Sequence, residues 1–492
     1  MLACGHDDPS GGFATCAHVE AGKPFVERFT GKGTETEILC TACRDAPGAI
    51  VRVCGACLQA IREQGDLERY LGEPGIVVEP STLRFAHLPP QTLRVAPLLD
   101  LRPRLGGDRD LWIGLTAHRE LVELDLDTSE VRRLAMVPEE LFRLNEHEHL
   151  EPTAPREPPP LTLHVSRDGA MAAVLQQDHG LVGAVIDLET GAQLMPLLRD
   201  YYCCEHCVHS FAFVEHGGRT LVIHASDWNR LDVHDPRTST LLTARGPTSY
   251  TRDQDRPPHY LDYFHCGLSV SPDHQRIVDN GWVWQPDNVI TTWQIEPWLT
   301  SNVWESEDGP TKKMLCWRGE WDQPLVWIDN THVAIWGYGQ DHKLIPAVRI
   351  FDTETARETS WFAGPRGELV FDRVLVSMDR DHGAAVWNVE RGSRLAHEPV
   401  SPTRYHPTAK TFLRFDGSTV IRSRLLGLAA ALAAGVIGEL AERIAREHAF
   451  GDLPVLGDAL EAAGCTDREM LAHCQQPGDH ADRCWVLERL RG

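Results

Sequence analysis

The stretch VIDLETGAQL, residues 185–194, decides the fold of this chain. It has the apolar end of a strand, an Asp at position 187, a turn of two or three residues and the start of another strand. The same design recurs along the chain at intervals of 36 to 62 residues. The marker positions of the other copies are Asp125, Asp235, Gln294, Asp352 and Asn388.

A second strand–turn–strand signal precedes most of these markers. The segments that carry it are residues 164–174, 212–223, 269–278, 326–336 and 404–415. Two hairpins per unit correspond to about four strands in each repeat of roughly 40 to 60 residues. Similar four-stranded units that stack on one another are typical of a propeller.

Residues 75–424, which hold all of these signals, resemble WD40-like β-propeller proteins. The resemblance rests on the turn pattern, since the Gly-His and Trp-Asp signatures of WD40 repeats are missing. It implies a mainly β fold. Six marked units and a final half-unit at residues 401–422 predict seven blades, with six as the alternative. We expect a strand from residues 75–100 to close the last blade, because closure removes the exposed sheet edges.

The remainder of the chain, residues 425–492, has a helical pattern. The stretch 423–450 predicts one long helix, and Pro454, Gly464 and Pro477 delimit two or three short helices after it. This tail is similar to a motif at the C-termini of many proteins of large-genome bacteria, a resemblance that implies no activity. The matching positions are Leu453, Pro454, Asp458, Ala459, Leu460, Gly464, Cys465, His473, Cys474, Cys484 and Trp485.

The bulk composition limits the partners and the location. A length of 492 residues suggests two or three domains. The net charge of -23 disfavours nucleic acid and anionic membranes and favours a partner with basic patches. The longest uncharged apolar run, residues 425–438, is 14 residues long and indicates a buried helix rather than a membrane span. Without a signal-peptide pattern, the chain is expected to be cytoplasmic.

Residues 1–72 are rich in potential zinc ligands. The stretch CTACRDAPGAIVRVCGAC, residues 40–57, holds two Cys-x-x-Cys pairs, and two Cys-x-His pairs precede it. The eight positions are Cys4, His6, Cys16, His18, Cys40, Cys43, Cys54 and Cys57. Cys-x-x-Cys pairs place thiolates at the spacing of zinc ligands. A segment with few large apolar residues needs metal for its stability, so we predict two structural Zn2+ ions.

The four ligand pairs allow either sequential or interleaved sites. The run resembles RING-like and treble-clef zinc domains, and in the RING arrangement the first pair joins the third while the second joins the fourth. The spacing departs from the RING pattern between His18 and Cys40, which are separated by 21 residues. The resemblance therefore implies a zinc-stabilised interaction module and does not establish ubiquitin-ligase chemistry.

A second Cys- and His-rich stretch, YYCCEHCVHSF at residues 201–211, offers ligands for a third zinc. The candidate ligands, completed by a later His-Cys pair, are Cys203, Cys204, His206, Cys207, His265 and Cys266. The alternative is a loop and strand start that are rich in these residue types without binding metal.

Tryptophan is concentrated in one region, since nine of the 14 lie between Trp282 and Trp336. We expect Trp282, Trp284 and Trp304, which stand among turn residues, to be exposed and to bind a partner. Phosphate-loop, nucleophile-elbow, dinucleotide and paired-acid motifs are absent from the sequence. The prediction is a non-catalytic scaffold for a protein or peptide; the alternatives are a RING-like ubiquitin-type ligase and another enzyme that uses the propeller pocket.

Overall fold

The computed structural model describes most of the chain after residue 75 and the backbone of four short strands before it. The described residues are 76–491 except 107–108, 144–159, 178–179, 252, 284–286, 339–343, 463–464, 466 and 476–483. The N-terminal strands form one sheet in the order β2-β3-β1-β4. Their bounds are β1 (Phe13–Cys16), β2 (Phe25–Phe29), β3 (Thr36–Cys40) and β4 (Ile50–Val53).

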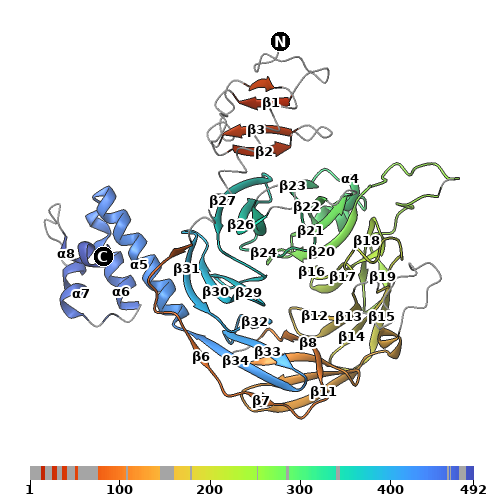
Figure 1. Cartoon of the computed structure of the whole chain (residues 1–492), viewed down its shortest axis with the longest axis horizontal. Helices are drawn as coiled ribbons and strands as arrows, with labels where there is room; N and C mark the ends of the chain where they lie inside the picture. The colour runs from red at the N-terminus through yellow and green to blue at the C-terminus, as the bar shows by residue number, and fades with distance from the viewer. Residues whose placement is uncertain are drawn as a thin grey trace.

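Seven antiparallel sheets form a β-propeller, as the sequence predicts (Figure 1). Blades 1 to 3 are β8 (Leu98–Pro103), β9 (Leu111–Thr116), β10 (Glu120–Asp125) and β11 (Glu130–Met136); β12 (Leu161–Val165), β13 (Met171–Gln176), β14 (Val182–Asp187) and β15 (Gln193–Leu198); β16 (Phe211–His216), β17 (Arg219–Asp227), β18 (Arg230–Asp235) and β19 (Thr240–Leu241). A 3-10 helix, η1 (Glu139–Phe142), follows β11.

Blades 4 to 7 follow in chain order. Their consecutive strands are β20 (Phe264–Val270), β21 (Arg276–Val283), β22 (Asp287–Gln294) and β23 (Lys313–Arg318); β24 (Leu325–Trp327), β25 (His332–Tyr338), β26 (Ile345–Asp352) and β27 (Arg357–Ala363); β28 (Glu368–Phe371), β29 (Leu375–Asp379), β30 (Gly383–Asn388) and β31 (Ser393–Glu398); β32 (Arg404–His406), β33 (Thr411–Asp416) and β34 (Thr419–Leu426). Neighbouring blades meet through their first strands, as β8 and β12 do.

The ring is closed by the segment that precedes the first blade. β6 (Arg84–His87) pairs antiparallel with β34 and becomes the fourth strand of blade 7, and β7 (Gln91–Thr92) also pairs with β34. β5 (Val77–Val78) adds a fifth, parallel strand to blade 6. The predicted closing strand within residues 75–100 is therefore confirmed.

The marker residues cap the turn between the third and fourth strands of their blades. Oδ1 of Asp187 accepts hydrogen bonds from the backbone N–H groups of Glu189 at 3.0 Å and Thr190 at 2.7 Å. Asp125 and Asp352 accept the same pair of bonds in blades 1 and 5. The carboxylate of Asp can accept hydrogen bonds from backbone N–H groups two and three residues later, and these turn amides have no partner in a neighbouring strand. Asp therefore recurs at this position.

Blade 4 departs from this design at its marker, Gln294. The chain does not turn directly but enters two short helices, α3 (Ile295–Thr300) and α4 (Glu305–Asp308), before β23 begins. Trp298 of α3 is buried against Trp293 of β22, with 5.7 Å between ring centroids. The insertion, residues 295–312, lengthens the connection between the third and fourth strands of blade 4 and adds its own apolar contacts.

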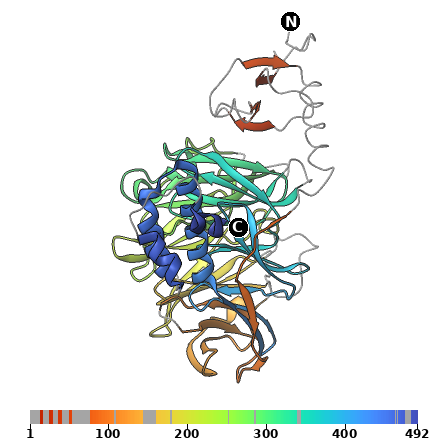
Figure 2. The same ribbon diagram turned by 90° about the vertical axis from the view of Figure 1, so that its left-hand side faces the viewer.

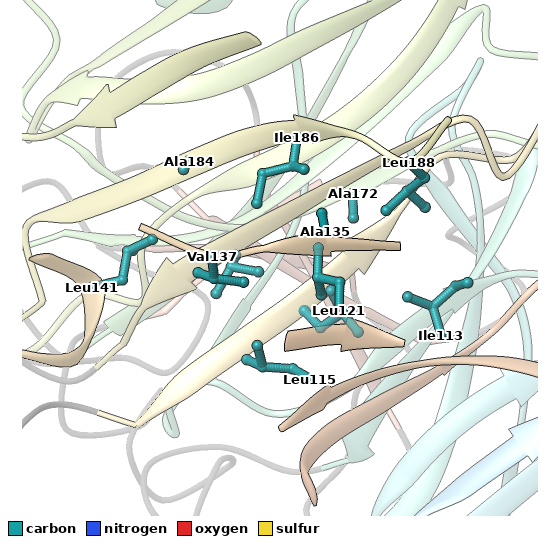
Figure 3. Close-up of a cluster of buried hydrophobic side chains, with 12 residues drawn as sticks. Ile113, Leu115, Leu121, Ala135, Val137, Leu141, Ala172, Ala184, Ile186 and Leu188 are labelled. Carbon is teal, nitrogen blue, oxygen red and sulfur yellow. The ribbon is translucent and has the colours of Figure 1, made fainter. Parts of the chain in front are cut away.

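Apolar side chains fill the spaces between neighbouring blades. Figure 3 shows the cluster between blades 1 and 2, in which Ile113, Leu115 and Leu121 of the first blade meet Ala172 and Ile186 of the second. All five side chains are almost inaccessible to solvent. At about 25 cal/mol per Å2 of buried apolar surface, such interfaces are the main stabilising contribution of a propeller.

The C-terminal residues form a cluster of helices at one side of the propeller (Figures 1 and 2). The helices are α5 (Leu428–Glu447), η2 (Phe450–Asp452), α6 (Leu453–Ala462), α7 (Arg468–Gln475) and α8 (Trp485–Arg491). The predicted long helix begins at residue 428 and not at 423, because Ser423 to Leu426 pair with β6. Within the described residues, every helix is too short or too polar to cross a membrane.

Candidate interaction surface on the linker face

One face of the propeller carries the loops that join the last strand of each blade to the first strand of the next. Because the strands of a blade are antiparallel, the turn between its second and third strands lies on the same face. We name it the linker face. From blade 2 to blade 5, its segments include residues 199–210, 228–229, 242–263 and 319–324.

Arg199 fixes the first of these segments. Its guanidinium donates hydrogen bonds to the backbone oxygens of Gly180 at 2.7 Å, Cys207 at 2.7 Å and Cys204 at 3.1 Å. Hydrogen bonds from a charged group contribute more than neutral ones, about 1.5–3 kcal/mol each. Residues 199–210 therefore form an ordered loop whose side chains have defined positions.

Asn229 fixes the third segment. Its side chain is fully buried, and Nδ2 donates hydrogen bonds to the backbone oxygens of Thr248 and Leu261, both at 2.9 Å. These two acceptors stand near the two ends of the segment, so one side chain ties both ends to the turn of blade 3. The tyrosines between them are thereby placed beside that turn.

Aromatic side chains from these segments and from β20 and β21 form a continuous cluster. Trp282 lies in its middle, with its ring stacked on Phe264 at 4.0 Å and on Trp321 at 5.0 Å between centroids. Phe264 also contacts Trp228 at 4.6 Å. The members of this aromatic cluster are Tyr202, His206, Trp228, Tyr250, Tyr260, Phe264, Trp282 and Trp321.

The aromatic cluster is buried at its base and exposed at its edge. Phe264 is 0% and Trp282 3% exposed, whereas Tyr202 is 44% and Tyr250 43% exposed. The neighbouring Tyr201 is 41% exposed. Exposed aromatic rings on well-ordered loops are characteristic of surfaces that bind other molecules.

The three tryptophans predicted to bind a partner have different environments. The expectation that Trp282 is exposed is wrong, because its ring is stacked inside the aromatic cluster. Trp284 lies outside the described residues. Trp304 is half-buried: its ring stacks on His259 at 4.3 Å, and the Arg245 guanidinium lies 5.6 Å from its centroid.

The tyrosines are the exposed residues that sequence reasoning missed. Tyr201 and Tyr202 directly precede the Cys-rich stretch, which drew attention only as a metal site. Tyr250 lies in a long connection rich in Pro, Asp and Thr. The sequence did carry a signal for these exposed tyrosines, since they are aromatic residues inside turn-rich segments between predicted blades.

The Cys-rich stretch forms the base of the aromatic cluster. The indole N–H of Trp282 donates a hydrogen bond to the sulfur of Cys207 at 3.2 Å, and Cys207 and Cys266 are buried in the same apolar cluster as Phe264 and Trp282. Burial raises the pKa of Cys203 to about 12 and that of Cys204 to about 11. These thiols are therefore neutral and act as compact apolar groups.

The structure does not bring the six residues proposed for a third zinc together as a site. His206 is exposed, and His265 is buried with Nδ1 2.5 Å from the carboxylate of Asp279. Among the described residues, no group of three or more His, Cys, Asp or Glu side chains is placed to hold a metal. The six residues are Cys203, Cys204, His206, Cys207, His265 and Cys266.

Two of the eight N-terminal ligand positions fall on described strands. β1 and β3 are adjacent and parallel, with Thr15 opposite Ile38, and they end at Cys16 and Cys40. The two cysteines therefore stand at the same end of the sheet. The other six positions lie outside the described residues: Cys4, His6, His18, Cys43, Cys54 and Cys57.

Two buried histidines, His209 just before β16 and His224 on β17, remain neutral at physiological pH. Burial lowers the pKa of His224 to about 4 and that of His209 well below its usual value. Nε2 of His224 lies 3.1 Å from Nδ1 of His234, so protonation of both rings would also place two cations in contact. Protonation of either buried ring is unfavourable, because a charged imidazole loses its hydration in this environment.

The free energy of unfolding is expected to fall as the pH drops from about 6.5 to about 4. The unfolded chain binds the His224 proton near pH 6.5, whereas the folded chain does not bind it until about pH 4, so acid favours unfolding. The effect is on the order of 3 kcal/mol. Denaturant unfolding at four pH values should show a smaller decline in the free energy of unfolding for His224→Gln than for the exposed control His118→Gln. Equal declines would contradict the prediction.

Comparison with known proteins finds distant structural likenesses and no match by sequence. No family model and no curated protein matches the sequence. Similar solved structures include a chain of "Crystal Structure of Mitotic Checkpoint Complex", with 12% identity over 71% of this chain and 93% of that chain and a TM-score of 0.40. Another is "Crystal structure of RRP9 WD40 repeats", with 11% identity, 71% and 99% coverage and a TM-score of 0.43.

These likenesses are too distant to carry an argument about function. The strand pairing of the chain itself defines a seven-bladed β-propeller, and WD40-repeat structures are among its structural neighbours.

Proposed function

We propose that the protein is a non-catalytic cytoplasmic scaffold whose propeller binds a protein or peptide and whose residues 1–72 form a zinc-stabilised module. The aromatic cluster is the observation that carries this proposal, because its exposed edge stands on loops fixed by Arg199 and Asn229. A surface that is already ordered loses little conformational entropy when a partner binds. Aromatic side chains also dominate the energetics of most protein interfaces.

The zinc module is proposed from the eight Cys and His residues and from the ends of the described strands. Cys16 and Cys40 end adjacent parallel strands, which supports one Zn2+ shared by the second and third ligand pairs. β4 runs antiparallel to β1, with Val53 opposite Phe13 at the other end of the sheet. Cys54 follows Val53 directly, which supports a second Zn2+ shared by the first and fourth pairs. This order differs from that of RING domains.

The binding role of the aromatic cluster predicts a loss of partner when its exposed rings are removed. The double variant Tyr202→Ala, Tyr250→Ala should keep its melting temperature, because both side chains are nearly half exposed. Recovery of the partner in a quantitative pull-down should fall about tenfold or more, which corresponds to about 1.4 kcal/mol.

The matched control is Trp361→Ala. This residue is 40% exposed on β27, the last strand of blade 5, and its ring stacks at 4.2 Å on Tyr338, which is not a member of the aromatic cluster. Its loss should leave partner recovery unchanged. A folded double variant that recovers the same proteins as the wild type would place the binding surface elsewhere on the chain.

A further inference from the structure

Three carboxylates surround the exposed edge of the aromatic cluster. Asp200 accepts a hydrogen bond from the backbone N–H of Tyr202 at 2.7 Å, and the phenol of Tyr260 donates one to Asp262 at 3.3 Å. Asp227, in the turn of blade 3, accepts from the backbone N–H of the next residue at 2.8 Å. Asp262 is exposed, and the other two are half-buried. The rings and the negative charges thus share one surface.

Two of these carboxylates, Asp200 and Asp227, make no ion pair with a Lys or Arg side chain among the described residues. Attraction to the neighbouring Arg199, which donates hydrogen bonds to backbone oxygens, favours the charged form of Asp200. Burial raises the pKa of Asp200, and repulsion from Asp227 adds to the increase. A cation brought to this place would meet Asp200, a carboxylate that has given up part of its hydration without forming an ion pair.

One cation of the chain already contacts the edge of this surface. The guanidinium of Arg256, an exposed residue of the segment 242–263, lies 4.4 Å from the centroid of the Tyr260 ring. Attraction between a cation and the face of an aromatic ring contributes about 0.5–2 kcal/mol, with Trp the strongest partner. The ring centroid of Trp228 lies 6.1 Å from that of Tyr260 and 5.5 Å from that of Tyr202, and its plane makes angles of 68° and 58° with those two rings.

We propose that this surface binds a Lys- or Arg-bearing segment of a protein partner, with the cationic side chain set against Tyr202 and Trp228 and paired with Asp200 and Asp262. The inference rests on the proposed function and specifies the chemistry of the partner. The overall charge of -23 assists the approach of a basic segment, although the aromatic rings and local carboxylates determine where it binds.

Three fluorescent 12-residue peptides on one Gly-Ser framework test this inference with the full-length protein. One carries four Lys, one four Arg and one four Glu, and binding is followed by fluorescence anisotropy. At least one of the cationic peptides should bind, and the Glu peptide should not. Asp200→Asn with Asp262→Asn should weaken binding about fivefold or more, because Asn keeps the hydrogen-bond acceptor and removes the charge.

The control must separate this surface from the charge of the whole protein. Glu130→Gln with Glu189→Gln changes the net charge equally, at exposed turns on the opposite face. It should change binding less than about twofold, since charges beyond a Debye length are screened. Tyr202→Phe should bind like the wild type and Tyr202→Leu should bind more weakly. Equal weakening by the Asp and Glu pairs, or equal binding of the Glu peptide, overturns the inference.

The same variants distinguish this inference from the proposed function. A natural partner that is lost from the Tyr202→Ala, Tyr250→Ala variant but is bound fully by the Asp200→Asn, Asp262→Asn variant would show that the surface binds through its apolar rings. That result overturns the cationic partner and leaves the scaffold role intact. A partner bound fully by both variants overturns the role of the whole surface.

Discussion

A chain that begins at residue 75 should retain the propeller, whereas a chain that begins at residue 93 should lose its seventh blade and unfold. The longer chain keeps β5, β6 and β7, and the shorter one removes all three. Without β6, the edge of β34 has no partner strand. The core of blade 7 also loses two apolar side chains, those of Phe85 and of Leu83, which is only 8% exposed.

The expected loss is comparable with the whole stability of a domain. Removing one buried Leu side chain typically costs about 2–5 kcal/mol, and domains are stable by about 5–15 kcal/mol. Circular dichroism melts and gel filtration would measure the difference between the two truncated chains. Melting temperatures within about 4 °C of each other would contradict the structural role of the closing strand.

Cys40→Ser should reduce the zinc content from two ions per chain to one and should destabilise the N-terminal module around the lost site, without changing the melting of the propeller. The binding free energy of a structural zinc, about 10–16 kcal/mol, is folding free energy for its own segment only. Elemental analysis and limited proteolysis would measure the two effects. Fewer than one zinc per chain in the wild-type protein, purified without chelators, would contradict the proposal.

The proposed pairing of the ligands gives this experiment two controls. If Cys16 and Cys40 share one ion, the double variant Cys16→Ser, Cys40→Ser should still hold one zinc. In the RING order, those substitutions affect different sites and both ions should be lost. Cys316→Ser, at a buried position on β23 of the propeller, should leave the zinc content unchanged.

The features predicted correctly from the sequence are those set by local backbone chemistry. Asp187 and its equivalents identify the blades because a carboxylate before a tight turn accepts the turn amides directly. The closing strand is also predictable, since a ring of sheets leaves one edge unpaired unless the N-terminus supplies a strand.

The features that were missed depend on contacts between distant segments. Trp282 stands among turn residues in the sequence, yet its ring stacks on Phe264 of β20 and on Trp321 of the loop 319–324. The start of α5 was misplaced because Leu425 and Leu426 fit the apolar period of a helix as well as that of a strand. Pairing with β6, about which local sequence carries no information, decides between the two.

The closing strands also determine the order in which this protein is completed during synthesis. Thr92 of β7 and Thr419 of β34, whose hydroxyl oxygens lie 3.2 Å apart, are separated by 327 positions in the chain. At about 5–20 residues per second, a ribosome needs on the order of 15–60 s to make that stretch. During this time β6 has no partner strand, and the nascent chain carries an unpaired edge outside the ribosome. Of the propeller strands, β6 is thus among the first to emerge and among the last to pair.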